Sequence, residues 1–449
     1  MADPLINQID QTNPIQINQT SLDHAETVAG TLAPGKSSGL ANALKSPALN
    51  LNQAERSKLI SDVAKTNPLA FYANDAFRSD PSASSGLKDD QKVIANGLQQ
   101  ALSDHAINLN DLEHIANVNP PQNGGAQRFM NVLMQADGAN QPGSAADQLA
   151  NNLFRGGSNG TDKAAAAMYY TSSPEAMQRG LTTPQQRLDA FNSLVDFNQS
   201  APYSSMLGTP LFKPLGTQLQ NQAIGAESNL FAAHGPELTG ALTQQDASTL
   251  PKPQVLAQFA SQTVFNPSAQ NIQLNDGSTL QSSMPAALQK AASSLMSTAQ
   301  KSEPNSAQQS RAIEQYARLS ASLAGGAALA LTHYDAQVQA YDASAKQVSD
   351  LVGGAVGQVV PLHTPFGNPA EKGAGSLSEQ LYNTFVSKPQ RPVLAAATDL
   401  QGNFQKSVEQ LRAQPGQPAS LVGTFEGVHA YTVNMLEGKF NINLGGHAN

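Results

Sequence analysis

From residue 51 onward, apolar residues recur every three or four positions, which is the repeat of an α-helix with one buried face. In the stretch LNQAERSKLISDVAKT, Asn52 is placed to cap the helix start, and Asn67 with Pro68 is placed to end the helix. The apolar face of this helix consists of Leu51, Ala54, Leu59 and Val63. The next stretch, DDQKVIANGLQQALSDHAINLNDLEHIANV, predicts two helices joined by a short break.

The same repeat continues through residues 145–205, where Ser173 followed by Pro174 marks one of the helix starts. Strand-like alternation is scarce. One exception is NIQLNDGSTLQS, in which Asn, Asp and Gly at 275–277 suit the turn of a β-hairpin. The pattern therefore predicts an all-α fold of multi-helical bundles with at most minor β-hairpins.

The longest pattern lies at about 311–360, where the positions of one helical face alternate between three- and four-residue steps, as in heptad repeats. We call this face the seam. Its positions are Ile313, Tyr316, Ser320, Leu323, Ala327, Ala330, Tyr334, Gln337, Tyr341, Ser344, Val348, Leu351, Ala355 and Gln358, with Leu331, Val338, Ala345, Val352 and Val359 beside them. The spacing predicts a long helix or a helical hairpin. Its many small residues predict that neighbouring helices approach closely.

Two other interpretations of this segment were considered. The uncharged stretch between Arg318 and Asp335 is shorter than the roughly 20 residues that a helix needs to cross a bilayer, and prolines interrupt 351–370. Because small residues also mediate helix packing in lipid, conditional membrane insertion stays open beside the favoured core or coiled-coil packing. A phosphate-binding loop at 353–357 is not supported, because no strand precedes these glycines and no lysine accompanies them.

Residues 1–50 differ from the rest of the chain. They are polar and broken by prolines, which predicts disorder. They have neither a basic start nor an apolar core, so they do not form a cleavable signal peptide. A polar, uncleaved leader of this kind is what needle-type and contractile secretion machines accept.

The sequence therefore divides into four expected parts. Residues 1–50 form a disordered polar export leader, and 51–205 form a first helical domain. Residues 206–360 form a second helical region that carries the seam. Residues 361–449 form a linker followed by a small C-terminal segment.

Composition and charge narrow the classes of function. Only 13% of the residues are charged, and the net charge is −8. Phosphate binding needs clustered Lys and Arg, and the chain has no basic run, so we expect no nucleic-acid partner. Cysteine is absent, which excludes disulfides, thiolate metal sites and a cysteine nucleophile. A chain threaded unfolded through a secretion channel benefits from lacking thiols that could pair wrongly.

Candidate catalytic residues are few. Residues 156–160 match G-x-S-x-G, but a nucleophile elbow needs a preceding strand and the sequence before them predicts a helix end. The histidines are scattered and none has metal-ligand spacing. The C-terminal segment holds Glu426, His429, Tyr431, Glu437 and His447, with strand-like alternation in Tyr431, Val433, Phe440, Ile442 and Leu444. A packed end segment is favoured over a small catalytic or partner-binding unit, so no catalytic, cofactor-binding or metal residue is assigned.

The segment at about 88–136 resembles a degenerate EF-hand. If Ile107 is the central apolar residue of the loop, Gln100 and Leu102 occupy the first and third ligand positions, and Asp111 occupies the last. His105 stands in place of the turn glycine. A calcium loop needs several carboxylates and that glycine, so calcium is not expected to bind. Asn108 with Asp111, or Asn110 with Glu113, could instead cap the second helix.

The order ALSDHAINLNDLEHIAN, a short Pro/Gln/Asn/Gly spacer and then AQRFMNVLMQAD also resembles modules of secreted bacterial virulence proteins, both translocator-like proteins and polymorphic toxins. The resemblance covers roughly this one segment and rests on helix spacing. Together with the absent cysteine and the polar leader, it implies a secreted bacterial effector or translocation accessory that acts by protein or membrane contact, without turnover.

Two alternatives stay open. One is an effector enzyme or toxin whose active unit lies in the C-terminal segment, and the other is a helical delivery region of a toxin. The expected partners are a secretion chaperone or the secretion machinery, and then a target-cell protein or membrane. The expected location is outside the producing cell, reached without a cleavable signal peptide.

Overall fold

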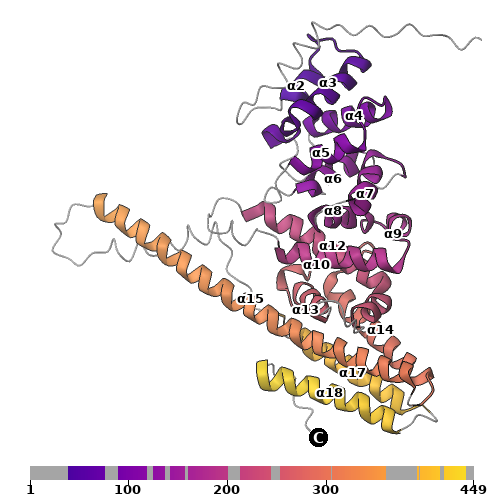
Figure 1. Ribbon diagram of the computed structural model, residues 1–449. Helices are drawn as coiled ribbons and strands as arrows, with labels where there is room; N and C mark the ends of the chain where they lie inside the picture. Colours follow the sequence, from indigo (N-terminus) through magenta and orange to yellow (C-terminus); the bar gives the residue numbers. More distant parts are fainter. Residues whose placement is uncertain are drawn as a thin grey trace, which may run out of the picture. The chain divides into compact units, whose positions relative to one another are not determined.

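The computed structural model describes residues 39–75, 89–118, 125–136, 142–156, 160–200, 213–243, 253–304, 306–359, 392–393, 395–414 and 419–440 (Figure 1). Within these ranges every element is a helix, apart from one isolated β-bridge, so the predicted all-α fold is confirmed. The chain divides into two compact units, unit 1 up to Gly156 and unit 2 from Gly157.

Unit 1 is a bundle of short helices around one core. Its elements are α2 (Gly39–Lys45), α3 (Gln53–Thr66), the 3-10 helix η1 (Pro68–Asp75), α4 (Asp89–Ser103), α5 (Leu109–Val118), α6 (Gly125–Ala136) and α7 (Ala145–Gly156). Helix α4 packs against α2, α3 and α6, and α5 packs against α3, α6 and α7. The buried side chains include Leu59, Ile60, Ile94, Leu98, Leu112, Ile115, Phe129, Leu149 and Leu153.

The predicted disorder does not extend as far as residue 50, and this part of the prediction is wrong. Helix α2 lies within that range, and Leu40, Leu44 and Leu49 are all buried. These leucines let α2 pack against α4 and η1, which offsets the entropy lost on ordering. Residues 1–38 lie outside the described residues, so the export leader stays a prediction.

Helix α3 begins as the sequence predicted. The Asn52 side chain accepts a hydrogen bond from the Glu55 backbone N–H at 3.0 Å, and the Glu55 side chain accepts one from the Asn52 N–H at 2.8 Å. This reciprocal capping box satisfies two backbone donors that the helix start leaves unpaired. The helix ends at Thr66, just before Pro68 begins η1.

The EF-hand-like segment is a helix–turn–helix. The Asn108 side chain accepts hydrogen bonds from the backbone N–H groups of Asn110 and Asp111, at 2.8 and 3.2 Å. The Asp111 carboxylate in turn accepts one from the Asn108 N–H at 2.9 Å. Of the two predicted capping pairs, Asn108 and Asp111 is therefore the one that forms. It engages the carboxylate that would have been the last calcium ligand.

Replacing His105 by glycine should stabilise unit 1 by about 0.5–1 kcal/mol, because a residue with a Cβ is strained in the left-handed region. His105 lies in the turn after α4 with φ 56°, and its side chain is exposed. The same substitution at the exposed His114, inside α5, should instead destabilise by a few tenths of a kcal/mol. Urea unfolding measures the change in the free energy of unfolding for both variants. A change of the same sign in the two variants would contradict backbone strain at His105.

Unit 2 is a larger helical assembly. Its elements are α8 (Gly160–Tyr170), α9 (Pro174–Gly180), α10 (Pro184–Ser200), α12 (Lys213–Thr243), α13 (Pro253–Gln262), the 3-10 helix η4 (Pro267–Ala269), α14 (Leu280–Lys301), α15 (Ala307–Val359), α17 (Ala395–Arg412) and α18 (Ala419–Phe440). Phe191 of α10, Phe231 of α12 and Phe259 of α13 meet in its core, with ring centroids 4.7–5.9 Å apart.

This division differs from the sequence-based one, which placed a domain boundary near residue 205. Helices α10 and α12 lie on either side of residue 205 and pack together, with Phe191 against Phe231. Both helices therefore belong to unit 2. The proline- and glycine-rich stretch between them connects two packed helices of one unit and does not separate two domains.

The predicted β-hairpin is present in its smallest form. Gln273 forms an antiparallel bridge with Thr279. Gly277 has φ 80°, and its N–H donates to the Leu274 carbonyl at 3.0 Å, while the Leu274 N–H donates to the Ser278 carbonyl at 2.9 Å. Because α14 begins at the residue after Thr279, the chain leaves the extended conformation there and no second strand can form.

The seam segment forms a single helix rather than a hairpin. Helix α15 is continuous over 53 residues. Where its side chains are described, the seam is buried at Tyr316, Ser320, Leu323, Ala327 and Ala330 and half-buried at Ile313 and Tyr334, so the predicted core packing holds for the middle of this part. Leu331 beside the seam is only half-buried, and the seam side chains from residue 336 onward lie outside the described set.

The C-terminal segment is helical where it is described, although Tyr431 and Val433 alternate as in a strand. Residues 419–440 form α18, which packs against α15 and α17. Leu421, Val422 and Phe425 are buried at helical spacing, and this upstream face fixes the conformation of the segment. Residues 441–449, which include Ile442, Leu444 and His447, lie outside the described residues.

Candidate functional site

Helix α15 crosses α13 at very close range, and two neighbouring glycines make this possible. A Cβ added to Gly326 would lie 2.7 Å from the Ala260 Cβ and 2.8 Å from the Ala257 carbonyl oxygen. A Cβ added to Gly325 would lie 3.4 Å from the Ala257 Cβ, which is ordinary contact. The uncharged stretch between Arg318 and Asp335 thus contains a helix crossing in the core. Among the helices of the described residues, none is long and apolar enough to span a membrane.

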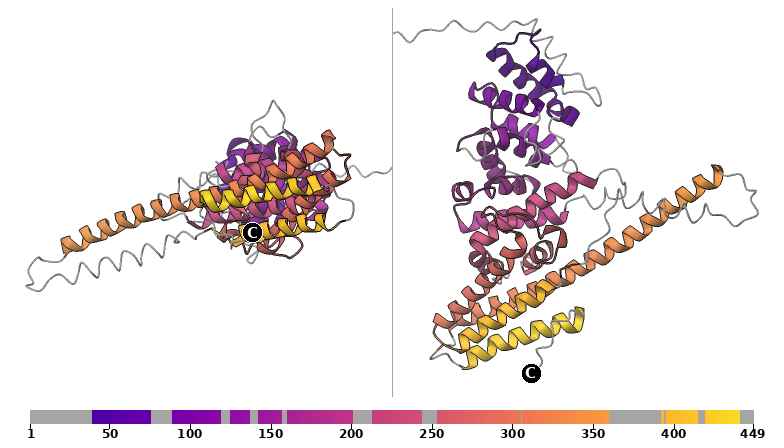
Figure 2. Two further views of the ribbon diagram at one scale, coloured as in Figure 1. Left: turned by 90° about the horizontal axis from the view of Figure 1, so that it is seen from below. Right: turned by 180° about the vertical axis from the view of Figure 1, so that it is seen from behind.

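A second packing centre joins α15 to the two C-terminal helices. The Tyr316 ring lies 4.9 Å from that of Phe425, edge to face, and 6.1 Å from that of Phe404. All three rings are buried, and burial raises the pKa of the Tyr316 phenol. The rings dock α17 and α18 beside the first half of α15, as both views of the fold show (Figure 2).

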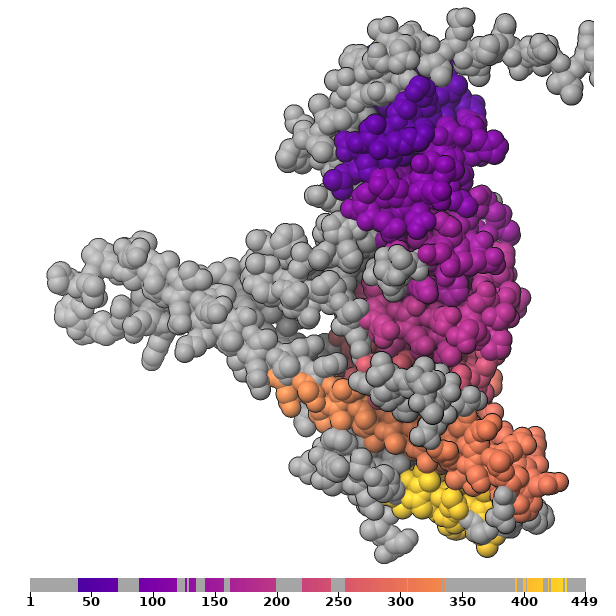
Figure 3. Space-filling model, in the orientation of Figure 1, coloured from indigo at the N-terminus to yellow at the C-terminus, as the bar shows by residue number. Residues whose placement is uncertain are grey.

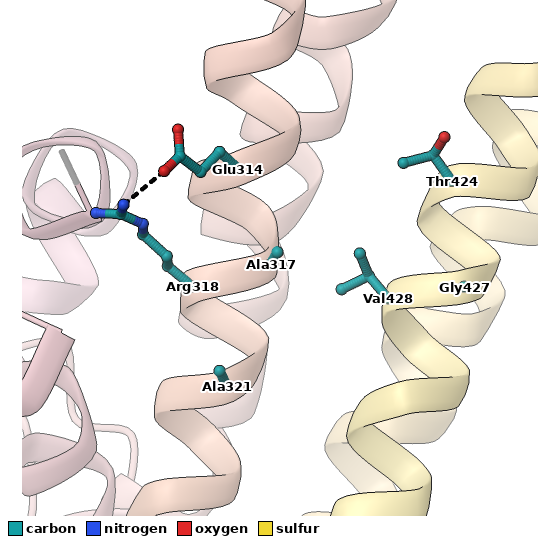
Figure 4. A pocket seen from close by; sticks show the side chains of 7 residues that line it. All are labelled: Glu314, Ala317, Arg318, Ala321, Thr424, Gly427 and Val428. Carbon is teal, nitrogen blue, oxygen red and sulfur yellow. Dashed lines mark hydrogen bonds and ion pairs between the residues drawn. The ribbon is translucent and has the colours of Figure 1, made fainter. Parts of the chain in front are cut away.

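On the outer side of this contact, α15 and α18 border an open groove of about 540 Å³ (Figure 4). It is lined by Glu314, Ala317, Arg318 and Ala321 of α15 and by Thr424, Gly427 and Val428 of α18. The surfaces of the two helices adjoin along this side of the unit (Figure 3). We call this feature the α15–α18 groove.

The floor of the α15–α18 groove is made of small side chains. Ala321 and Gly427 are exposed, and a Cβ added to Gly427 or to Gly423, one turn earlier, would meet nothing within 4 Å. The spacing of Ala317 and Ala321 on α15 matches that of the two glycines on α18, so each helix presents small residues one turn apart. Such surfaces allow another helix backbone to approach closely.

One charged pair borders the α15–α18 groove, and it is held in place. The Arg318 guanidinium donates to the Glu314 carboxylate at 2.5 Å and to the Thr243 carbonyl at 3.2 Å. Thr243 is the last residue of α12, so Arg318 satisfies one of the carbonyls left free at that helix end. In Figure 4 both charged groups point away from α18, which leaves their aliphatic stems at the groove.

The later half of α15 extends past the other described helices of unit 2 (Figures 1 and 2). Its backbone stays helical to Val359, so positions three and four residues apart remain on one side of the helix throughout. The contacts of α15 with α13, α14, α17 and α18 involve its earlier part, as the same figures show.

Charged groups gather at a second place, beside a kink in α12. The kink lies at His234, whose φ of −126° is not helical, two residues before Pro236. Arg187 of α10 binds Glu237 through two hydrogen bonds of 2.8 Å and also donates to the Leu181 carbonyl at 2.9 Å. Arg187 lowers the pKa of Glu237, and burial lowers the pKa of His234. The hydrogen bonds of Arg187 with Glu237 thus connect α10 to α12 beside the kink.

The residues that the sequence singled out for chemistry do not come together in the described part of the chain. Gly156 ends α7 and Gly160 begins α8, while residues 157–159 lie outside the described residues. On α18, Glu426 pairs with Arg412 of α17, and His429 is half-buried. The side chains of Tyr431 and Glu437 are not among those described. Nowhere in the described ranges do three or more His, Asp or Glu side chains gather as they would to hold a metal ion.

Sequence reasoning missed the α15–α18 groove. A signal for it was present, since alanines at 317 and 321 and glycines at 423 and 427 each lie one helical turn apart. Small residues at that spacing also occur where helices cross inside a core, as at Gly326, so the pattern alone could not distinguish the two.

Comparison with known proteins adds no further guide to this site. No protein-family model matches the chain. No curated protein matches it, and neither does any solved structure. Its function has to be argued from its own residues.

Proposed function

We propose that this chain is a secreted bacterial effector or translocation accessory that acts without turnover, by binding a helical segment of another protein along α15. The α15–α18 groove is the binding site, and the later half of α15 extends the contact. The observation that carries the proposal is the groove itself, an exposed strip of small residues between two helices of unit 2.

The shape of the groove favours a helix as its ligand. Helix-in-groove recognition needs a strip along which apolar side chains, spaced three and four residues apart, can insert. Ala317 and Ala321 on one wall and Gly427 on the other leave room for such side chains. Because Arg318 and Glu314 already pair with each other, the groove offers little free charge, and binding should depend only weakly on salt.

The composition of the chain supports the secreted part of the proposal. With no cysteine and only 13% charged residues, the chain can pass unfolded through a channel without forming disulfides. The partners we propose are a secretion chaperone or part of the secretion machinery before export, and a target-cell protein after it.

Photo-crosslinking tests the binding site directly. A photoreactive phenylalanine derivative at Ala321, in the full chain within living cells, should give a protein adduct of one defined mass. The matched control is Ala286, an exposed alanine on α14. We expect no such adduct at Ala286. When the crosslinking is repeated in cell lysate, the yield of the Ala321 adduct should change little between low and high salt. Identical adducts at both positions, or adducts to lipid alone, would contradict protein recognition by the groove.

Truncation of the C-terminal segment would not test the enzymatic alternative. Ending the chain near residue 375 would remove Phe404 and Phe425 from their contacts with Tyr316, so a loss of function would reveal nothing about catalysis. Point variants are cleaner. Glu426→Gln keeps the shape of a half-buried side chain on α18, and a biological effect that depends on this carboxylate would favour the enzyme.

A further inference from the structure

Among the described acidic residues of unit 2, Glu227 is the most deeply buried. It lies on α12 with none of its surface exposed. One carboxyl oxygen accepts a hydrogen bond from the Asn198 side-chain amide of α10 at 3.2 Å. The other oxygen, Oε1, has no hydrogen-bond partner among the described residues, and neither has Oδ1 of Asn198, which is itself 7% exposed.

A charged carboxylate would be very costly in this position. Removing an ion from water without a counter-ion costs several kcal/mol even after relaxation. Burial raises the pKa of Glu227 well above its ordinary value, and the hydrogen bond from Asn198 lowers it only in part. The helices that pack against α12 carry these charged residues in their described parts: Asp162, Lys163, Arg187, Asp189, Asp196, Lys290, Lys301, Arg311, Glu314, Arg318 and Asp335.

None of these groups neutralises Glu227. Arg187 binds Glu237, which lies ten residues further along α12, on the order of 15 Å away at 1.5 Å per residue. Arg318 binds Glu314 and the end of α12. No charged group of the described residues contributes to the shifted pKa of Glu227. The carboxyl group therefore has no counter-ion there.

A single proton would satisfy both unpartnered oxygens. If Oε1 of Glu227 carries the proton, it can donate to Oδ1 of Asn198, while the Asn198 amide donates to the other Glu227 oxygen as observed. The acid and the amide would then be joined by two hydrogen bonds in opposite directions. The two oxygens without a partner, Oε1 of Glu227 and Oδ1 of Asn198, belong to two residues that already share one hydrogen bond. This observation favours the pair with two hydrogen bonds.

We propose that folded unit 2 holds Glu227 as the neutral acid in a reciprocal pair with Asn198, and that loss of this proton loosens the contact between α10 and α12. Unit 2 thus contains a pH-responsive link between these two helices. The proposal does not depend on the α15–α18 groove or on secretion.

The sign of the pH effect follows from the direction of the shift. A group whose pKa is higher in the folded state binds its proton more tightly there, so its stabilising contribution is complete below the unfolded value. That value for glutamate is 4.5. As pH rises above it and through the folded pKa, this contribution is lost, and each pH unit in this window lowers the folding equilibrium constant by up to tenfold.

Glu227→Gln provides the central test, because glutamine supplies a permanent donor to Asn198 and cannot titrate. In the full chain, the variant should equal the wild type near pH 4.5 and exceed it at pH 8, with amide hydrogen exchange in α10 and α12 slower than in the wild type. Glu237→Gln is the matched control on the same helix. Because Arg187 lowers the pKa of Glu237, removing that charge should destabilise most at neutral pH.

A spectroscopic measurement does not depend on how well the variants fold. As pH rises above 4.5, the ordinary value for glutamate, the wild type should keep the infrared band of a protonated carboxyl group that Glu227→Gln lacks. Asn198→Leu should shift this band. A wild type without this band, or a Glu227→Gln protein whose stability changes with pH as steeply as that of the wild type, would overturn the proposal.

Discussion

Replacing Gly326 by alanine should destabilise unit 2 by about 2–3 kcal/mol, because overpacking a close helix crossing forces the backbones apart. The new Cβ would lie 2.7 Å from the Ala260 Cβ and 2.8 Å from the Ala257 carbonyl oxygen. The carbonyl belongs to the α13 backbone and cannot rotate away. The higher helix propensity of alanine, worth up to about 1 kcal/mol, offsets only part of this cost.

Gly325 is the matched control, one residue earlier on the same helix. A Cβ there would lie 3.4 Å from the Ala257 Cβ, so Gly325→Ala should be neutral or should stabilise by up to about 1 kcal/mol. Thermal and urea unfolding, followed by circular dichroism, measure both variants. Equal effects from the two substitutions would show that the crossing of α13 and α15 is not as close as described.

Replacing Gly180 by alanine should cost at least about 3 kcal/mol, since the added Cβ would enter a buried aromatic ring. Built on the backbone, it would lie 2.0 and 2.2 Å from two carbons of the Tyr170 ring. Tyr170 is only 4% exposed, and its ring packs edge to face against Tyr169. The ring therefore has no free space to enter, and α9 would have to move away from α8.

A double variant separates this clash from a general loss of helix stability. Tyr170→Ala alone should destabilise, yet Gly180→Ala should cost much less in the Tyr170→Ala background than in the wild type, because alanine has no atom beyond Cβ at the place of the clash. Gly240→Ala in α12, where an added Cβ meets nothing within 4 Å, is the control for adding a methyl group. Additive effects of the Gly180 and Tyr170 substitutions would rule out direct contact as the cause.

Local patterns in the sequence were sufficient to predict the helical class and several helix starts. The Asn52 cap and the start at Ser173, whose side chain accepts from the Ala176 N–H at 3.1 Å, depend on neighbouring residues only. The seam through Tyr316 and Leu323 was predictable for the same reason. One helical face repeats with a period that packing preserves.

Short apolar runs were less informative. Tyr431 and Val433 alternate as in a strand, yet they continue a helix that is anchored about two turns upstream by Phe425, which packs on Tyr316. The two rings are more than a hundred residues apart in sequence. Contacts at that separation leave no trace in a local window, so the alternation at Tyr431 and Val433 was a poor guide to the local structure.

The α15–α18 groove and the buried pair of Glu227 and Asn198 also depend on contacts between residues far apart in sequence. Ala317 and Gly427 border one groove only because α18 docks on α15. The helical spacing of Ile224, Leu230 and Phe231 places Glu227 on an apolar face, but the local sequence does not show which group would bind its carboxyl there. Its environment depends on Asn198, which lies beyond the proline-rich stretch that suggested a domain boundary.

The continuity of α15 has a mechanical consequence. The crossing at Gly326 clamps the helix to α13, and from there to Val359 the axis runs on the order of 50 Å at 1.5 Å per residue. No proline interrupts this length. The helix can therefore serve as a lever with its pivot at the glycine pair. A rotation of about 5° at the pivot would displace the far end by roughly 4 Å. A ligand seated in the α15–α18 groove, beside the pivot, would act on the short arm, and its effect would be amplified at the tip.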